Sequence, residues 1–155
     1  MLARLLFLLL CLVAAACAAP MTPPKEFVEL KDYGYGWRAI TSDDARLRIT
    51  DHDDPTQGGI EFWSETLRLD LVQQRGYEQI ASGEVKNEAG GTGQWFQFAA
   101  NVRGQRIGYL VAVWVVDPSW PLSSNFLRVA EFAARDEVFK ARLEGVLASL
   151  STVGG

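Results

Sequence analysis

Two neighbouring stretches of alternating side chains, residues 94–103 and 106–117, limit the folds open to this chain more than any other feature. Their alternation predicts a long β-hairpin with Gly104-Gln105 at its tip. Because side chains alternate between the faces of a strand, a strand that is apolar on both sides must be covered on both faces. The second stretch has this property, with Ile107, Tyr109, Val111, Val113 and Val115 on one side and Leu110, Ala112, Trp114 and Val116 on the other. We therefore expect residues 106–117 to form a central strand of the sheet.

Other segments complete an α+β pattern. Shorter strands are expected over residues 27–30, 77–86 and 126–133, and a hairpin is expected from 37–41 and 46–51. Apolar residues at helical spacing predict a helix over residues 60–75, and Gly76 suits the left-handed position after its end.

The clearest helix is expected at the end of the chain, over residues 136–150. Asp136 and Glu137 favour its N-terminus. Arg142 lies beside the apolar stripe and is expected to keep its guanidinium in water. The stripe itself consists of Val138, Phe139, Leu143, Val146, Leu147 and Leu150.

The N-terminal segment resembles a bacterial lipoprotein signal. An apolar run follows Arg4 and ends in Ala14-Ala15-Ala16-Cys17. The run is shorter than the roughly 20 apolar residues of a membrane-spanning helix and has the length of a cleaved signal. We expect residues 1–16 to be removed and Cys17 to be acylated. Cleavage by an ordinary signal peptidase, leaving a free thiol, is the alternative, because the pattern usually has Leu where Ala14 stands.

The rest of the chain is expected to be one domain. Residues 17–26, which include Pro20, Pro23 and Pro24, predict a short extended tether, and residues 27–155 the domain. The sequence has 15 basic and 19 acidic residues, and removing Arg4 with the signal leaves a net charge of −5. The two signs are interspersed without a basic stripe, which disfavours nucleic-acid binding. Apart from Cys17 the mature chain has no cysteine, which excludes an internal disulfide and a thiolate metal site.

The order of elements resembles the PsbP-like family, which includes the extrinsic PsbP subunit of oxygen evolution and bacterial DcrB-type lipoproteins. The resemblance covers residues 27–150. It is carried by Gly36-Trp37, by the helix over 60–75 and by the terminal helix with Phe139, Leu143 and Val146 to Leu150. It implies an antiparallel β-sheet flanked by helices on both faces, a PsbP-like α/β/α sandwich. The family is largely non-enzymatic and has no shared catalytic residues, so no site residue carries over.

Three polar clusters are candidate sites, and each has a simpler structural explanation. Residues 51–54, Asp-His-Asp-Asp, contain the only histidine, but consecutive residues of a strand point to opposite faces and rarely converge on one ion. Residues 42–44, Ser-Asp-Asp, suit a type I turn. Residues 90–93, Gly-Gly-Thr-Gly, lack the Lys-Ser/Thr and the following helix of a phosphate-binding loop. We therefore predict no metal site and no cofactor, and we expect His52 to be neither ligand nor catalyst.

The aromatic residues leave one candidate contact site. Trp37, Trp63, Trp95 and Trp114 lie in segments with apolar periodicity and are expected in the core. Trp120 lies between Pro118 and Pro121, where it is a candidate contact with a partner. The sequence equally favours the alternative that Trp120 folds back over the edge of the sheet.

These observations favour a non-catalytic, lipid-anchored envelope protein. It is expected to be held to the membrane by its acyl chains and to bind an envelope protein partner or assist an assembly. The outer membrane, facing the periplasm, is the expected location, since no Asp follows Cys17. The alternative is a lipoprotein that carries a small apolar ligand between sheet and helix. An envelope hydrolase is a third hypothesis, because nineteen acidic residues can supply a catalytic pair of carboxylates.

Overall fold

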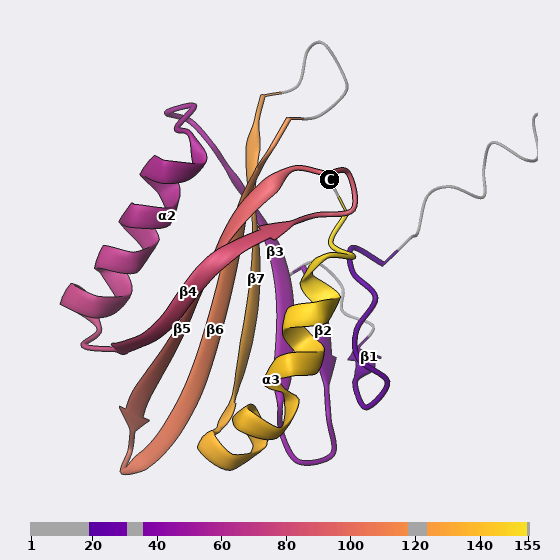
Figure 1. Ribbon diagram of the computed structural model, residues 1–155, viewed down its shortest axis with the longest axis vertical. Coiled ribbons are helices and arrows are strands. Elements are labelled where there is room, and N and C mark those ends of the chain that lie inside the picture. The colour runs from indigo at the N-terminus through magenta and orange to yellow at the C-terminus, as the bar shows by residue number, and fades with distance from the viewer. Residues whose placement is uncertain (1–18, 31–35, 118–123, 155) are drawn as a thin grey trace, which may run out of the picture.

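The computed structural model describes residues 19–30, 36–117 and 124–154, and Figure 1 shows their arrangement. Cys17 and Trp120 lie outside the described residues. The described strands are β1 (Val28–Leu30), β2 (Trp37–Ile40), β3 (Arg46–Asp53), β4 (Glu78–Lys86), β5 (Thr92–Val102), β6 (Gln105–Val116) and β7 (Phe126–Arg135). The described helical elements are α2 (Ile60–Leu69), the π-helical turn η1 (Asp70–Gln74) and α3 (Asp136–Leu150).

The strands form one antiparallel sheet in the order β1-β2-β3-β7-β6-β5-β4. β6 lies between β7 and β5 and pairs with both along nearly its whole length, which confirms the predicted central strand. The tip of the β5–β6 hairpin lies one residue earlier than predicted. Val102 pairs with Gln105, and the two loop residues, Arg103 and Gly104, both have positive φ, as a tight primed turn requires.

The helices begin and end close to where the sequence predicts. α3 spans the predicted residues, and α2 with η1 covers residues 60–74 of the predicted 60–75. Gly76 follows with a φ of 69°, the left-handed conformation expected of it. The α+β class is thereby confirmed.

One face of the sheet is covered by α3. Phe139 of α3 stacks on Phe132 of β7, with ring centroids 4.8 Å apart and planes inclined by 11°. Gly108 of β6 makes this position possible, because a Cβ atom there would lie 2.2 Å from the Phe139 ring. The buried cluster on this face also contains Leu110 and Trp114.

The opposite face is covered in part by α2 and η1. Leu71 of η1 forms a second buried cluster with Phe96, Phe98 and Val111. Val111 and its neighbour Leu110 belong to different clusters, which places α2 and α3 on opposite faces of the sheet (Figure 1). Both faces of β6 are therefore covered by helices, as its two-sided apolar pattern predicts.

The first described residues are bound to the end of the chain. Met21 is 1% exposed and lies in the core beneath α3. Gly154 N donates to Pro20 O at 2.9 Å, and Thr22 N donates to Thr152 Oγ1 at 2.9 Å. We expected residues 17–26 to form an extended tether, but the described part of this segment packs against the domain from Pro20 onwards. An apolar methionine at position 21 is the cause, since burying it is favourable.

Arg142 differs from its expected position in solvent. Its side chain is 21% exposed, and its Nη2 donates to Asp43 Oδ2 at 2.6 Å. Asp43 lies in the turn between β2 and β3, so this ion pair joins α3 to that turn. The pairing lowers the pKa of the Asp43 carboxyl, and the Thr41 hydroxyl contributes to the same effect.

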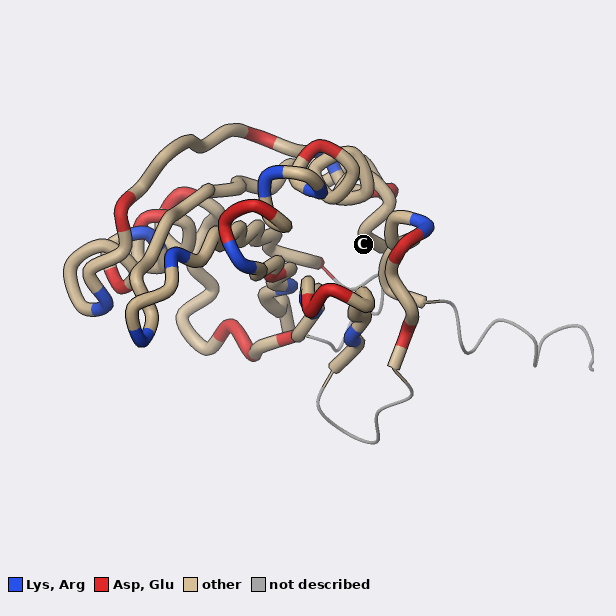
Figure 2. Tube along the Cα trace, turned by 90° about the horizontal axis from the view of Figure 1, so that it is seen from below, with Lys and Arg blue, Asp and Glu red and all other residues tan. Residues whose placement is uncertain are grey.

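Charges of both signs alternate around the described chain, as Figure 2 shows. Most of the described arginines that make ion pairs do so with a carboxylate on the same or a neighbouring element, as Arg68 does with Glu65. No helix in the described part of the chain has the length and hydrophobicity to cross a membrane.

Candidate functional site

The sheet face that carries α2 is only partly covered by that helix. α2 contacts β5 and β6, whereas β3, β2 and β1 continue the same face beyond it. On this outer part, β3 presents Arg46, Arg48, Thr50 and His52, because the alternate residues Leu47 and Ile49 are buried under α3. Polar residues therefore lie on the part of the sheet that α2 does not cover.

Two rows of side chains cross this face from strand to strand. In the first row, Leu30 pairs with Arg38, Arg38 with Arg48, and Arg48 with Glu131. The neighbouring row runs from Val28 through Ile40, Arg46 and Ala133 to Tyr109. Two arginines stand directly opposite each other in the first row, an arrangement that costs stability unless negative charge balances it.

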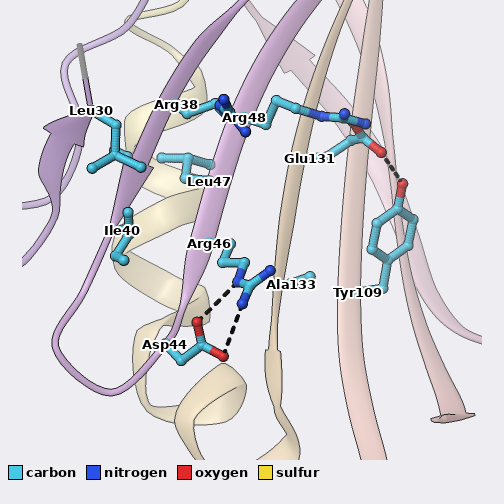
Figure 3. A pocket seen from close by; sticks show the side chains of 11 residues that line it. Leu30, Arg38, Ile40, Asp44, Arg46, Leu47, Arg48, Tyr109, Glu131 and Ala133 are labelled. Carbon is cyan, nitrogen blue, oxygen red and sulfur yellow. Dashed lines mark hydrogen bonds and ion pairs between the residues drawn. The ribbon is translucent and has the colours of Figure 1, made fainter. Parts of the chain in front are cut away.

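Glu131 supplies negative charge at the centre of the face. Its Oε2 accepts hydrogen bonds from Nε and Nη2 of Arg48, the former at 2.7 Å, and its Oε1 accepts one from the Tyr109 hydroxyl at 2.6 Å. In Figure 3 these side chains point toward one another from β3, β7 and β6. Burial of Tyr109, and then its proximity to Glu131, raises the pKa of the tyrosine far above its usual value. Tyr109 therefore acts as a neutral hydrogen-bond donor.

A second ion pair lies at the rim of the face. Arg46 Nε donates to Asp44 Oδ1 at 2.9 Å, and Nη2 is 3.3 Å from Asp44 Oδ2 (Figure 3). The side chains are 72% and 66% exposed, so this pair is open to water. Asp44 has a φ of 65°, a turn conformation that aspartate tolerates better than most residues.

These residues line two adjoining hollows. The outer hollow, about 400 Å³, lies over β1, β2, β3 and β7 and is lined by Leu30, Ile40, Arg46 and the central Arg48, Glu131 and Tyr109. The inner hollow, about 530 Å³, lies between α2 and the sheet. Both are lined by Arg48, Tyr109 and Glu131, so they meet at the central network. We call the two together the groove.

The inner hollow combines apolar side chains with polar ones. Its helix side contributes Trp63, Thr66 and Leu67, and η1 contributes Leu71. Its floor comes from β6 and β7, with Val111, Val113, Leu127 and Val129. Arg75 and Asp70, which form an ion pair of 2.9 Å, also line this hollow, as do His52 and Asp53.

The cluster at residues 51–54 is divided among different partners. Asp51 binds Arg128 at 2.8 Å on the α3 face, whereas His52 points to the other face and lies 3.0 Å from the Thr50 hydroxyl. Asp54 is buried, and its Oδ1 accepts hydrogen bonds from Gly58 N and Trp63 Nε1, both at 3.1 Å. Among the described residues no group of three metal-binding side chains is assembled. The prediction for His52 stays a prediction.

The remaining candidates are mostly turns and core residues. Asp43 and Asp44 lie in the β2–β3 turn, where Thr41 accepts from Asp44 N through its carbonyl and from Ala45 N through its hydroxyl. Of the glycine-rich residues, Gly90 and Gly91 lie in the β4–β5 turn, with Gly91 N bound to the Asn87 side chain, and Thr92 and Gly93 begin β5. Trp114 is fully buried, whereas Trp63 is only partly buried and lines the inner hollow.

Sequence reasoning missed the residues at the centre of the groove. Arg46 and Arg48 were expected only as part of the predicted hairpin, and Glu131 and Tyr109 were not singled out as site residues. The available signal was the spacing of two arginines at alternate positions of one strand. What the sequence does not show is that β7 places Glu131 beside them, because β3 and β7 are about 80 residues apart along the chain.

Comparisons with known proteins identify the fold. The sequence matches no protein-family model, and no curated protein is significantly similar to it. The structure is similar to LpqN of Mycobacterium tuberculosis, described as involved in cell envelope biogenesis, with a TM-score of 0.63 and 9% identity over 84% of this chain and 78% of LpqN. It is also similar to PA94 of Pseudomonas aeruginosa, a protein of unknown function described as a putative regulator, with a TM-score of 0.55 and 11% identity over 92% of this chain and 87% of that one. At these identities the likeness concerns the fold alone.

Proposed function

We propose that this protein is a non-catalytic, lipid-anchored protein of the bacterial cell envelope that binds a small ligand with an apolar part in the groove. The inner hollow carries the proposal. Its volume of about 530 Å³ lies within the roughly 300–1,000 Å³ of small-molecule sites, and aliphatic and aromatic side chains from α2, η1, β6 and β7 line it together with a few polar ones. This favours the ligand carrier, which was the alternative in the sequence analysis, over the partner-binding function that was preferred there.

Binding rather than catalysis is supported by the state of the polar groups. Glu131 accepts hydrogen bonds on both oxygens, and Tyr109 is held as a neutral donor. A general base needs an oxygen or nitrogen that is free to take a proton from a substrate. The central carboxylate is instead engaged by donors from two residues, Arg48 and Tyr109. Separately, charges of both signs interspersed along the sequence support a function without nucleic acid.

The anchor and the location are part of the same proposal. Acylation of Cys17 is supported by the apolar run that ends in Ala15-Ala16-Cys17, and the outer membrane by the absence of Asp after it. The shared fold with LpqN, a protein of cell envelope biogenesis, is consistent with an envelope role. We retain the PsbP-like assignment here, because α2 and α3 lie on opposite faces of an antiparallel sheet, as that resemblance implies.

Isolation of the protein from its own envelope tests this function. Mass spectrometry should find a diacyl- or triacylglyceryl group on Cys17 and a small molecule with an apolar part that co-purifies with the protein. Thr66→Phe places a large side chain at an exposed position over the inner hollow and should abolish co-purification. Thr92→Phe, at an exposed position of β5 outside the groove, is the matched control. Equal ligand content in the two variants would contradict the proposal.

Docking of a protein partner is the second candidate function. Val28 and Leu30 of the edge strand β1 are 67% and 44% exposed and lie on the same face as the outer hollow. Exposed apolar residues on an edge strand are typical of contact surfaces. Cross-linking in the envelope should then capture one partner with the parent chain and lose it with Val28→Lys. The control Lys25→Ala, at an exposed residue nearby, should retain it.

A further inference from the structure

We propose that the ligand of the groove is a single-chain amphiphile with an anionic head group. The head lies against Arg46 and Arg48, and the chain lies in the inner hollow. This inference rests on the proposed function, since it specifies the ligand of the same site.

The head-group end is assigned from the two arginines of β3. Each guanidinium has five N–H donors, and Arg46 and Arg48 each contact one carboxylate. Residues two apart on a strand point to the same side and are separated by roughly 7 Å, so one carboxylate or phosphate can approach both. The Arg46 pair with Asp44 is exposed, and pairs of this kind contribute little to stability and are easily exchanged.

The hydrogen bonds of Glu131 reduce the repulsion between its carboxylate and an anionic ligand nearby. Both oxygens of Glu131 accept hydrogen bonds, one set from Arg48 and one from Tyr109. Its negative charge is therefore balanced inside the protein, and the Tyr109 hydroxyl is directed at Glu131 rather than at the ligand. An anionic head placed over Arg46 and Arg48 meets three arginines, because Arg38 lines the same hollow, and two carboxylates, Asp44 and Glu131, that are each paired with an arginine. A cationic head would meet unfavourable charge at the same place.

The chain end is assigned from the aliphatic side chains of β6 and β7 that line the inner hollow. Arg48 pairs with Glu131 of β7, whereas Leu127, which lies opposite His52 at the other end of the inner hollow, is four residues away on the same strand. At about 3.3 Å per residue this separation is roughly 13 Å. One leaflet of a bilayer has a hydrocarbon depth of roughly 15 Å, so an acyl chain of ordinary lipid length can reach from Arg48 to Leu127.

The ends of the described chain lie at the Leu127 end of the sheet, on its opposite face. Arg128, next to Leu127, donates to Gly154 O at 2.6 Å, and Gly154 is bound to Pro20. If the anchor at Cys17 holds this end at the membrane, the Leu127 end of the groove is the part nearest to the bilayer. A membrane amphiphile then meets the inner hollow first.

Binding of three chain-matched compounds tests the inference: hexadecanoic acid, hexadecyl phosphate and hexadecanol. The whole mature chain is used with Cys17→Ser, so that it is released in soluble form, and the compounds displace an environment-sensitive fluorescent dye below their micelle concentrations. The two anions should bind at least about tenfold more tightly than the alcohol, as expected of two charge-assisted contacts. The anion with the lower Kd identifies whether the natural head is a carboxylate or a phosphate.

Variants at the head-group end provide the second comparison. Arg46→Gln should weaken both anions about fivefold and leave hexadecanol unchanged. Asp44→Asn, which frees Arg46 and keeps a residue suited to positive φ, should strengthen them. Arg106→Gln is the control, because Arg106 has a comparable exposed pair with Glu78 outside the groove.

The outcomes separate this inference from the proposed function. Equal binding of acid and alcohol, or equal effects of Arg46→Gln and Arg106→Gln, would overturn the anionic head, while loss of all three compounds in Thr66→Phe would still support the apolar site. Binding of the anions that Thr66→Phe leaves intact would overturn the position of the chain. If none of the three compounds binds, the inference and the proposed ligand site fail together.

Discussion

At the scale of single residues, Arg142 shows how a charge beside an apolar stripe can become part of the packing. Its methylene groups lie against the domain, and its guanidinium reaches Asp43 in the β2–β3 turn. An arginine can bury its stem in this way while its head finds a carboxylate. Sequence periodicity places Arg142 at the margin of the stripe but does not reveal the partner 99 residues away.

Replacing Arg142 should therefore cost stability. Arg142→Ala removes both the buried stem and the ion pair, and we expect the melting temperature to fall by a few degrees. Arg46→Ala, which removes an exposed pair with Asp44, should change it much less. Differential scanning calorimetry of the two variants checks this. Equal melting temperatures would mean that the Arg142 contact is no more than a surface pair.

Tyr109 gives the domain a dependence on alkaline pH. Its pKa is raised in the folded protein by burial and by Glu131. Below about pH 10 both folded and unfolded chains keep the proton, so the full stability is present. Above about pH 10 the unfolded chain loses it first, and the free energy of unfolding should fall by about 1.4 kcal/mol per pH unit.

Urea unfolding between pH 8 and 11 measures this fall. Tyr109→Phe removes the titrating hydroxyl and should flatten the alkaline part of the profile. Glu131→Gln should keep most of it, because burial is the larger cause. A profile that is the same in the parent chain and in Tyr109→Phe would contradict the assignment.

At the scale of elements, two glycines have opposite roles around α3. Gly108 of β6 provides the space for the Phe139 ring, and any Cβ there would overlap it. Gly145 lies at an exposed position within α3, and a Cβ there would be 3.8 Å from Pro24, an ordinary contact. A glycine inside a helix costs about 0.5–1 kcal/mol relative to alanine.

We expect alanine at these two positions to change stability in opposite directions. Gly108→Ala should destabilise the domain by about 1–3 kcal/mol, since overpacking displaces Phe139. Gly145→Ala should stabilise it by about 0.5–1 kcal/mol. Chemical denaturation of both variants and of the parent chain, at equal protein concentration, measures these differences in the free energy of unfolding. Stabilisation by Gly108→Ala would show that Phe139 is not seated over β6 in solution.

The elements themselves were largely predictable from sequence. The two-sided apolar pattern of residues 106–117 identified β6 as central, and the stripe from Val138 to Leu150 identified α3. The groove was not predictable to the same degree. It depends on which part of the sheet α2 leaves open and on the register between β3 and β7, and both are set by long-range packing. Local patterns do not record such contacts.

At the scale of the whole molecule, the two ends of the described chain hold each other in place. Met21 is buried beneath α3, and Pro20 and Thr22 are hydrogen-bonded to Gly154 and Thr152. This arrangement is not evident from the sequence, because three prolines near position 20 are equally typical of an extended tether. Proline restricts the backbone in either case, and only the core contact of Met21 distinguishes them.

Met21 should therefore contribute to stability as a core residue does. Met21→Ala in the soluble mature chain should lower the free energy of unfolding by about 2–5 kcal/mol, as for other large apolar residues truncated in a core. Lys25→Ala, at an exposed position of the same segment, should lie within about 0.5 kcal/mol of the parent. If Met21→Ala is as stable as Lys25→Ala, residues 20–26 behave as a tether.

The contact between Pro20 and Gly154 makes this fold a candidate for circular permutation. A short linker can join the two neighbouring ends, and new termini can be opened in the tight Arg103-Gly104 loop at the far end of the β5–β6 hairpin. The core and the groove would be unchanged in such a chain. If Cys17 carries the proposed acyl anchor, moving that anchor to the new N-terminus would turn the molecule over, so that the arginine end of the groove would face the bilayer and the Leu127 end would point away from it.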